Sequence, residues 1–376
     1  MDTSPSDPAD LLNTVKEFAE THILPRRQEL IVAKEFPADL WQAFAQSGLA
    51  GLSIPEQYGG RGASYQVLST AANYLNLYGG VPGATMTFLA HWQLIKLHIV
   101  EQADHSLKQE LLPLLANGEA TLSVAISEPK AGAHPKHLKT TADRVGNDYI
   151  LNGEKAFLTN GPLARYFIVL AITAEHNSRR SFSAILVDAS TAGLTRTDGV
   201  KIDFLHPCPH GGILLQNCKV PLSNLIGAEG DAFLRTSLRM RAIEDAVGAA
   251  SHIGALKRLL DDIIKDIPEN LADEVGQITS QFLALDVVAR ELALRADQAS
   301  EDMDFLLHLQ LGFRQQMMAC GAIMDTLVQE IDLSDRPEIA LLHRDITKSH
   351  SIAQSAHAAR LTKFGRSKLT APEINR

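Results

Sequence analysis

The chain has 376 residues, of which 45% are hydrophobic and 21% are charged, and its formal net charge is −9. A chain of this length can bury a large core and form two or three domains. Its acidic balance and its lack of a basic tract argue against a nucleic-acid partner and against binding to an anionic membrane surface.

The beginning of the chain does not have the pattern of a signal peptide. The segment from Met1 to Asp10 is acidic and rich in proline, without the basic and apolar parts of a signal peptide. Uninterrupted apolar runs stay below the roughly 18 residues of a membrane helix, so no membrane span is expected. The three cysteines, Cys208, Cys218 and Cys320, form no disulfide framework, which favours a reduced, cytoplasmic setting.

Hydrophobic periodicity predicts helices at both ends of the chain and strands in the middle. Apolar residues recur at helical spacing over residues 10–50 and again over 66–116. Compact apolar runs bounded by polar or glycine-rich turns then follow, as in short strands. These runs are Phe167–Leu170, Ser183–Val187 and Gly212–Leu215.

The helical period returns after about residue 230 and predicts four further helices. Their expected ranges are 232–262, 272–300, 304–333 and 337–364. We therefore expect an N-terminal helical domain over 1–116, a central β domain over 117–226 and a C-terminal helical bundle over 227–376.

Two segments carry most of the chemical information. Residues 124–161 alternate like strands between fixed polar points, namely Ser127-Glu128-Pro129, Asn152-Gly153, Phe157 and Thr159-Asn160-Gly161. Upstream, the sequence Ile54-Pro55-Glu56-Gln57-Tyr58-Gly59-Gly60 has the proline and paired glycines of a tight connection.

Both segments closely resemble the acyl-CoA dehydrogenase family of flavoproteins, and the resemblance extends over roughly residues 12–350. It implies a mainly α fold with a β-barrel-like middle domain and a C-terminal four-helix bundle. It also implies an FAD cofactor and the α,β-dehydrogenation of an acyl-CoA or a related acyl thioester. Family members pass electrons to an electron-transfer flavoprotein and form homodimers or homotetramers, so the resemblance implies these partners as well.

The resemblance also implies which residues bind the flavin. Ser127, with Ile126 before it, matches a position that hydrogen-bonds the flavin, and Phe157 and Thr159 match a pair that packs on the ring and contacts its edge. A flavin ring needs an apolar face and a few fixed polar groups near its reactive edge. Gln277 matches a glutamine of the family's cofactor-binding stretch. The structural alternative is that the two hydroxyls end strands and that Phe157 belongs to the core.

Glu244 matches the catalytic base of one branch of the family, in which the glutamate lies ten residues before the glycine matched by Gly254. In the other branch a glutamate follows an Arg-Asp pair. Here Arg344-Asp345 is followed by residues 346–355, which contain no glutamate. A carboxylate in a dry pocket has a raised proton affinity, which suits the removal of a proton from a weak carbon acid. The alternative role of Glu244 is a surface ion pair with Arg241.

Several positions expected near the substrate differ from the family pattern. Ala133 replaces a serine, Asp245 replaces an arginine next to Glu244, and His206 stands in a loop that usually reads Arg-x-Ser. Arg241, one helical turn before Glu244, is the fourth residue expected near substrate. The arginine that binds the flavin diphosphate in relatives is absent from residues 259–274.

These departures keep two other functions open. One is a flavin oxidase or monooxygenase on the same scaffold, and the other is a non-catalytic relative with weakened flavin binding. A metal site is not expected, because His206, Cys208, His210 and Cys218 match no common zinc spacing and read as an extended loop.

Overall fold

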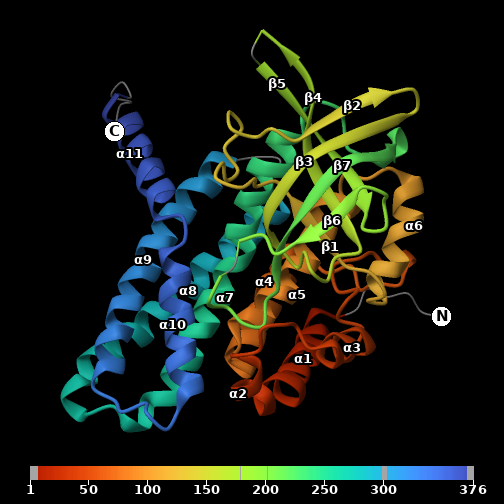
Figure 1. Ribbon diagram of the computed structural model, residues 1–376. Helices are drawn as coiled ribbons and strands as arrows, with labels where there is room; N and C mark the ends of the chain where they lie inside the picture. Colours follow the sequence, from red (N-terminus) through yellow and green to blue (C-terminus); the bar gives the residue numbers. More distant parts are fainter. Residues whose placement is uncertain (1–6, 178, 201, 299–302, 371–376) are drawn as a thin grey trace.

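The computed structural model describes residues 7–177, 179–200, 202–298 and 303–370. Helices precede and follow a central sheet, as the sequence predicts (Figure 1). The N-terminal helices are α1 (Pro8–Phe18), α2 (Arg27–Leu30), α3 (Ala38–Gln46), α4 (Tyr65–Tyr74), α5 (Pro82–Leu94) and α6 (His105–Ala116).

The central part is an eight-stranded sheet in the order β6-β7-β3-β2-β4-β5-β8, with β1 parallel to β4. Its strands are β1 (Leu122–Ala125), β2 (Thr141–Val145), β3 (Asp148–Thr159), β4 (Tyr166–His176), β5 (Arg179–Asp188), β6 (Leu194–Thr197), β7 (His210–Pro221) and β8 (Leu225–Ile226). The three apolar runs predicted as strands lie within β4, β5 and β7. The exact limits of the three domains remain predictions.

The C-terminal part consists of long α-helices. A π-helical segment, η7 (Phe233–Arg239), precedes them and continues directly into the first α-helix. They are α7 (Met240–Ile263), α8 (Ala272–Asp297), α9 (Met303–Gln329), α10 (Pro337–Ser351) and α11 (Gln354–Thr370). The predicted ranges of the first three agree within a few residues, although 299 and 300 lie outside the described residues.

The prediction of one helix over 337–364 is wrong, because the chain breaks between α10 and α11. Ile352 is extended and Ala353 has a positive φ of 56°. Arg314 of α9 donates to the carbonyl of His350 at 3.2 Å and also to that of Ile352. A side chain from another helix thus binds the carbonyls that the break leaves open, and neither glycine nor proline marks the position in the sequence.

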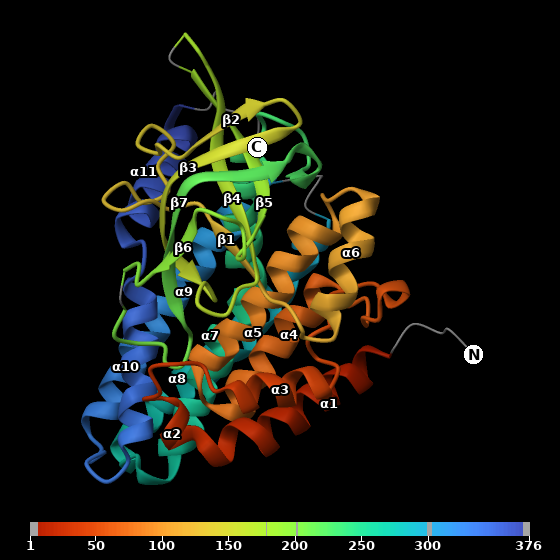
Figure 2. The ribbon, with the colours of Figure 1, turned by 45° about the vertical axis from the view of Figure 1, so that its right-hand side comes forward.

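The N-terminal helices pack directly on the C-terminal ones, and α4 lies along α7 (Figure 2). A Cβ at Gly254 of α7 would lie 2.4 Å from the carbonyl oxygen of Asn73 in α4. The Asn73 amide donates to the Ala250 carbonyl at 2.8 Å. Glycine is therefore required at 254 because the two helix backbones approach so closely.

A buried ion pair also joins these two parts of the chain. Arg27 Nη2 and Asp262 Oδ2 are 2.6 Å apart, and the two side chains are 7% and 6% exposed. Arg27 also donates to the Gly80 carbonyl at 3.2 Å. Across the described ranges, no helix has the length and apolarity that a bilayer crossing needs.

Candidate active site

Phe157 and Thr159, at the C-terminal end of β3, and Ser127, in the segment that follows β1, form what we call the shelf. The backbone N–H of Ala156 donates to the Ser127 carbonyl at 2.8 Å, which holds the segment after β1 against β3. The pairing of β3 with β7 is interrupted between Lys155 and Leu158. Phe157 lies in this bulge with a φ of 61°, and 47% of it is exposed. The bulge thus turns a large aromatic ring outward, in a backbone conformation that such residues rarely adopt.

The two segments that meet here also carry two hydroxyl groups, those of Ser127 and Thr159. Ser127 is partly exposed, and no other described residue hydrogen-bonds its hydroxyl. Thr159 is also partly exposed, and its hydroxyl lies 3.3 Å from Nε2 of His210. An exposed aromatic side chain in a segment that also carries partly exposed hydroxyls fits a flat heteroaromatic ring such as an isoalloxazine.

A buried ion pair between Lys155 and Glu128 stabilises the backbone on either side of Ser127. Lys155 is fully buried, and its Nζ lies 3.0 Å from Glu128 Oε1 and donates to the Ile126 carbonyl at 3.0 Å. Glu128 also accepts hydrogen bonds from the Thr140 N–H and hydroxyl, at 2.9 and 2.7 Å, and from the Lys139 N–H at 2.7 Å. The segment that contains Ser127 is therefore fixed by several hydrogen bonds on the protein side.

The electrostatics of this pair follow from its burial. Burial lowers the pKa of Lys155 to about 8, although Glu128 opposes this. Burial alone would raise the pKa of Glu128, but Lys155 and Thr140 outweigh it and hold that pKa below its usual value. The pair stays ionised at neutral pH because each partner stabilises the charge of the other.

Glu244 lies on α7 and is partly exposed. Loss of solvation, with a smaller contribution from the adjacent Asp245, outweighs the opposing effect of Arg241 and raises the pKa of Glu244 to about 7. The Asp245 carboxylate is 48% exposed and lies 3.9 Å from Arg360 of α11. Burial nevertheless raises the pKa of Asp245. Solvent thus reaches carboxylates that the surrounding protein largely desolvates, as expected in a recess.

The space next to Glu244 is also open. A Cβ at Gly248, one helical turn after Glu244, would meet no atom within 4 Å. Arg241, one turn before Glu244, is exposed. This face of α7 therefore differs from the face at Gly254, which is closed by α4.

The other predicted site residues lie on separate elements. Ala133 is partly exposed in the loop after β1, and His206 is partly exposed in the loop before β7. Ile126 is buried and contributes its carbonyl to Lys155. Gln277 is exposed on α8, where its carbonyl accepts a hydrogen bond from Ser280 at 2.8 Å. Gln277 thus lies on a different element from the three shelf residues.

Two contributors to the site do not follow from the sequence motifs. The sequence predicts only a loop around His210, and it indicates no role for Lys155, although Lys155 stands inside the motif. A lysine within a strand of buried residues is the signal that could have identified Lys155. His206, Cys208, His210 and Cys218 are not grouped as metal ligands in the part of the chain that the structure describes.

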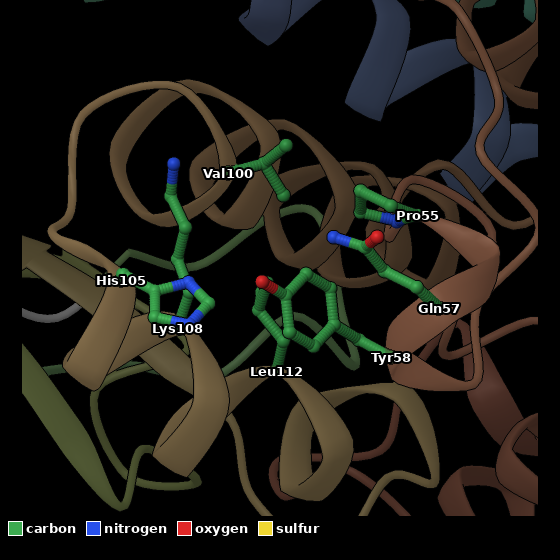
Figure 3. A pocket seen from close by; sticks show the side chains of 7 residues that line it. All are labelled: Pro55, Gln57, Tyr58, Val100, His105, Lys108 and Leu112. Carbon is green, nitrogen blue, oxygen red and sulfur yellow. The ribbon is translucent and has the colours of Figure 1, made fainter.

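The N-terminal motif lines a separate cleft of about 310 Å³. Figure 3 shows the Tyr58 ring at its centre, with Lys108 and His105 on one side and Gln57 and Pro55 on the other. No predicted site residue lines this cleft. The motif at residues 54–60 is therefore part of the connection between N-terminal helices rather than part of the shelf.

Comparison with known proteins agrees with this architecture. The acyl-CoA dehydrogenase N-terminal domain matches residues 6–119, and the acyl-CoA dehydrogenase middle domain matches residues 123–217. The mitochondrial isovaleryl-CoA dehydrogenase of Pongo abelii is 30% identical over 299 residues, which are 76% of this chain and 68% of that protein. The chain spans less than two thirds of two other relatives. The alignment covers 65% of the mitochondrial isovaleryl-CoA dehydrogenase of Solanum tuberosum and 57% of an acyl-CoA dehydrogenase of Bacillus subtilis.

Solved structures share the whole fold. Butyryl-CoA dehydrogenase from Megasphaera elsdenii superposes with a TM-score of 0.85 at 21% identity, covering 98% of this chain and 100% of that one. The FAD complex of PigA superposes with a TM-score of 0.79 at 22% identity, covering 95% and 99%. The chain, with helices before and after an eight-stranded sheet, thus has the acyl-CoA dehydrogenase fold. The chain belongs to the acyl-CoA dehydrogenase family.

Proposed function

We propose that the protein is an FAD-dependent oxidoreductase that removes the α and β hydrogens of an acyl-CoA or a related acyl thioester. The observation that carries this proposal is the shelf, where a bulge exposes Phe157 two residues before Thr159 and next to Ala156, whose N–H binds the Ser127 carbonyl. The names of relatives, isovaleryl-CoA dehydrogenase among them, support the same class of reaction.

In this proposal Phe157 lies against the flavin ring, and the Ile126–Ser127 segment and Thr159 contact its edge. FAD, when bound, supplies an acceptor for the hydride that leaves the β carbon of the substrate. The exposed face of Phe157 binds a flat ring by stacking, which needs no rearrangement of the protein. Residues 259–274 contain no arginine for the diphosphate, so other groups must hold that part of the cofactor.

Glu244 is the proposed base that takes the α proton of the thioester. With a pKa of about 7, its carboxylate is ionised in a large fraction of molecules at neutral pH. It is also a stronger base than an ordinary glutamate, which favours proton transfer from carbon. The open space at Gly248 leaves room for a substrate chain beside it.

The partners follow from family membership and belong to the proposal. They are an acyl thioester as substrate, an electron-transfer flavoprotein as electron acceptor, and further copies of this chain in a homodimer or homotetramer. Ala133, His206, Arg241 and Asp245 are proposed to line the path of the substrate, and Gln277 to contact FAD across subunits.

The proposal is tested by absorbance spectra of the FAD-loaded protein before and after anaerobic addition of an acyl-CoA panel. We expect at least one thioester to bleach the flavin band, and we expect Glu244→Gln to retain FAD but to lose this bleaching. Asp245→Asn removes the adjacent carboxylate but leaves the base in place, so it should still bleach. Bleaching that persists in Glu244→Gln would remove Glu244 from the mechanism.

Two further observations on the purified protein distinguish the alternative functions. Rapid oxygen consumption by the thioester-reduced protein would identify an oxidase or monooxygenase. A protein that stays colourless after incubation with FAD would identify a non-catalytic relative.

A further inference from the structure

The hydroxyl of Thr159 lies within hydrogen-bond distance of His210, a residue to which the family resemblance gives no role in flavin binding. Thr159 ends β3 and lies opposite His210, the first residue of β7, in the antiparallel pairing of the two strands. Thr159 Oγ1 and His210 Nε2 are 3.3 Å apart, and His210 Nδ1 lies 3.1 Å from the carbonyl oxygen of Cys208. The imidazole therefore bridges the shelf and the preceding loop.

The surrounding backbone fixes the position of this ring. The Asn160 N–H donates to the Pro209 carbonyl at 2.8 Å, and the buried Asn160 amide donates to the Thr87 carbonyl at 2.9 Å. The same loop packs on α5, where a Cβ at Gly83 would lie 2.1 Å from the Leu205 carbonyl oxygen. His210 is thus held between a strand end and a loop that cannot easily move.

The direction of each hydrogen bond follows from the chemistry of the partners. A carbonyl oxygen only accepts, so Nδ1 of His210 must carry a hydrogen in order to bond to Cys208. A neutral imidazole carries one N–H, which leaves Nε2 as an acceptor. Burial lowers the pKa of His210; the Cys208 carbonyl opposes this and the nearby His206 adds to the lowering. The Thr159 hydroxyl must then donate its only hydrogen to His210.

We infer that His210 is a positioning residue that makes Thr159 a hydrogen-bond acceptor toward the flavin and thereby stabilises the reduced cofactor. N5 of an oxidised isoalloxazine is an acceptor, whereas the reduced ring carries an N5–H that donates. A hydroxyl whose hydrogen is directed at His210 can bond only to the second form. This inference rests on the proposed flavin site, and it adds to that site a group that tunes the reduction potential.

The first test needs no cofactor. Nitrogen NMR spectra of the apo-protein labelled in its histidine rings should show His210 as the Nδ1–H tautomer at neutral pH. Thr159→Val should shift its Nε2 signal, because the donor to that nitrogen is lost. An Nε2–H tautomer or an imidazolium at neutral pH would overturn the assignment of the hydrogen bond, whatever the protein binds.

The second test measures the midpoint potential of the FAD-loaded protein. His210→Asn can keep an amide N–H near the Cys208 carbonyl, but its side chain is too short to place an acceptor at the position of Nε2, so Thr159 becomes free to donate. We expect the preference for reduced over oxidised FAD to fall about tenfold, which is about 30 mV for a two-electron couple. His210→Gln places an acceptor near the position of Nε2 and should restore most of this preference.

A double-mutant cycle completes the test. In a Thr159→Val background, His210→Asn should leave the potential unchanged, because the group through which His210 acts is gone. An equal shift with and without Thr159 would show that His210 acts in another way and would overturn the inference. Failure of the wild-type protein to bind FAD would instead overturn the proposed function, while the NMR result would still decide the direction of the hydrogen bond.

Discussion

Lys155 and Glu128 form an ion pair under the shelf, with Nζ and Oε1 3.0 Å apart and exposed fractions of 0% and 7%. We expect Lys155→Met to lower the free energy of unfolding by about 3 kcal/mol, because it leaves Glu128 charged and buried without its partner. FAD binding should weaken as well, since Lys155 also holds the Ile126 carbonyl.

Urea unfolding and FAD titration of the variant measure these two effects. Lys219→Met is the matched control, because the Lys219 side chain is 69% exposed in its pair with Asp148. An exposed pair contributes less than about 1 kcal/mol. Equal losses for both lysine variants would show that burial of the pair does not matter.

Two glycines on α7 predict opposite effects of the same substitution. Gly254→Ala places a Cβ 2.4 Å from the Asn73 carbonyl and should destabilise the protein by about 1–3 kcal/mol through overpacking. Gly248→Ala meets open space and should stabilise the helix by up to about 1 kcal/mol. Thermal unfolding of the two variants checks the signs, and destabilisation by both would show that α7 is not open beside Glu244.

The buried pair between Arg27 and Asp262 predicts how strongly the N-terminal helices depend on α7. Arg27→Met should lower the free energy of unfolding by about 3 kcal/mol, since it leaves a buried carboxylate with fewer partners. Arg26→Met is the control, because Arg26 pairs with the exposed Glu29 and Asp39 and should contribute less than about 1 kcal/mol. Urea unfolding gives both values, and a larger loss for Arg26 would contradict the ranking.

The pKa of Glu244 predicts the pH dependence of the reaction. The base must be ionised, so the apparent second-order rate of thioester-dependent flavin bleaching should rise with pH through about 7. Asp245→Asn should move this midpoint down and Arg241→Gln should move it up, because these neighbours raise and lower the pKa of Glu244 respectively. Stopped-flow traces from pH 5.5 to 9 measure the midpoints, and shifts of the opposite sign would contradict the assignment.

The same pKa predicts an effect on stability. In the unfolded chain Glu244 has the ordinary pKa of 4.5, and folding raises it to about 7. Between these two values the folded state binds more protons, so the contribution of Glu244 to stability falls as pH rises across this window. Glu244→Gln should therefore flatten the pH dependence of the melting temperature between about pH 4.5 and 7.

Much of the fold could be predicted from the sequence because the spacing of apolar residues follows the buried face of each helix or strand. The strands β4, β5 and β7 were predicted at their apolar runs, and α7 to α9 at their helical spacing. The break before α11 could not be predicted, because Ala353 is neither glycine nor proline. Its conformation depends on Arg314, which lies 39 positions earlier and reaches the broken end only in the folded protein.

The site could be predicted in part for a similar reason. Ser127, Phe157 and Thr159 stand in one continuous motif, so their grouping follows from short-range spacing. His210 is 51 positions from Thr159, and only the register between β3 and β7 brings the two together. The bulge that exposes Phe157 also depends on that register, so the sequence alone could equally place the ring in the core.

The central claim is that the shelf binds FAD, and the affinity of FAD for Phe157 variants tests it most directly. Phe157→Gly removes the exposed ring and suits the positive φ, so we predict unchanged or higher thermal stability with about three- to tenfold weaker FAD binding. Phe157→Trp should bind as tightly as the wild-type protein. The control Val145→Ala, at another exposed apolar side chain of the sheet, should bind normally. Equal FAD affinity in Phe157→Gly and wild-type protein would contradict the claim.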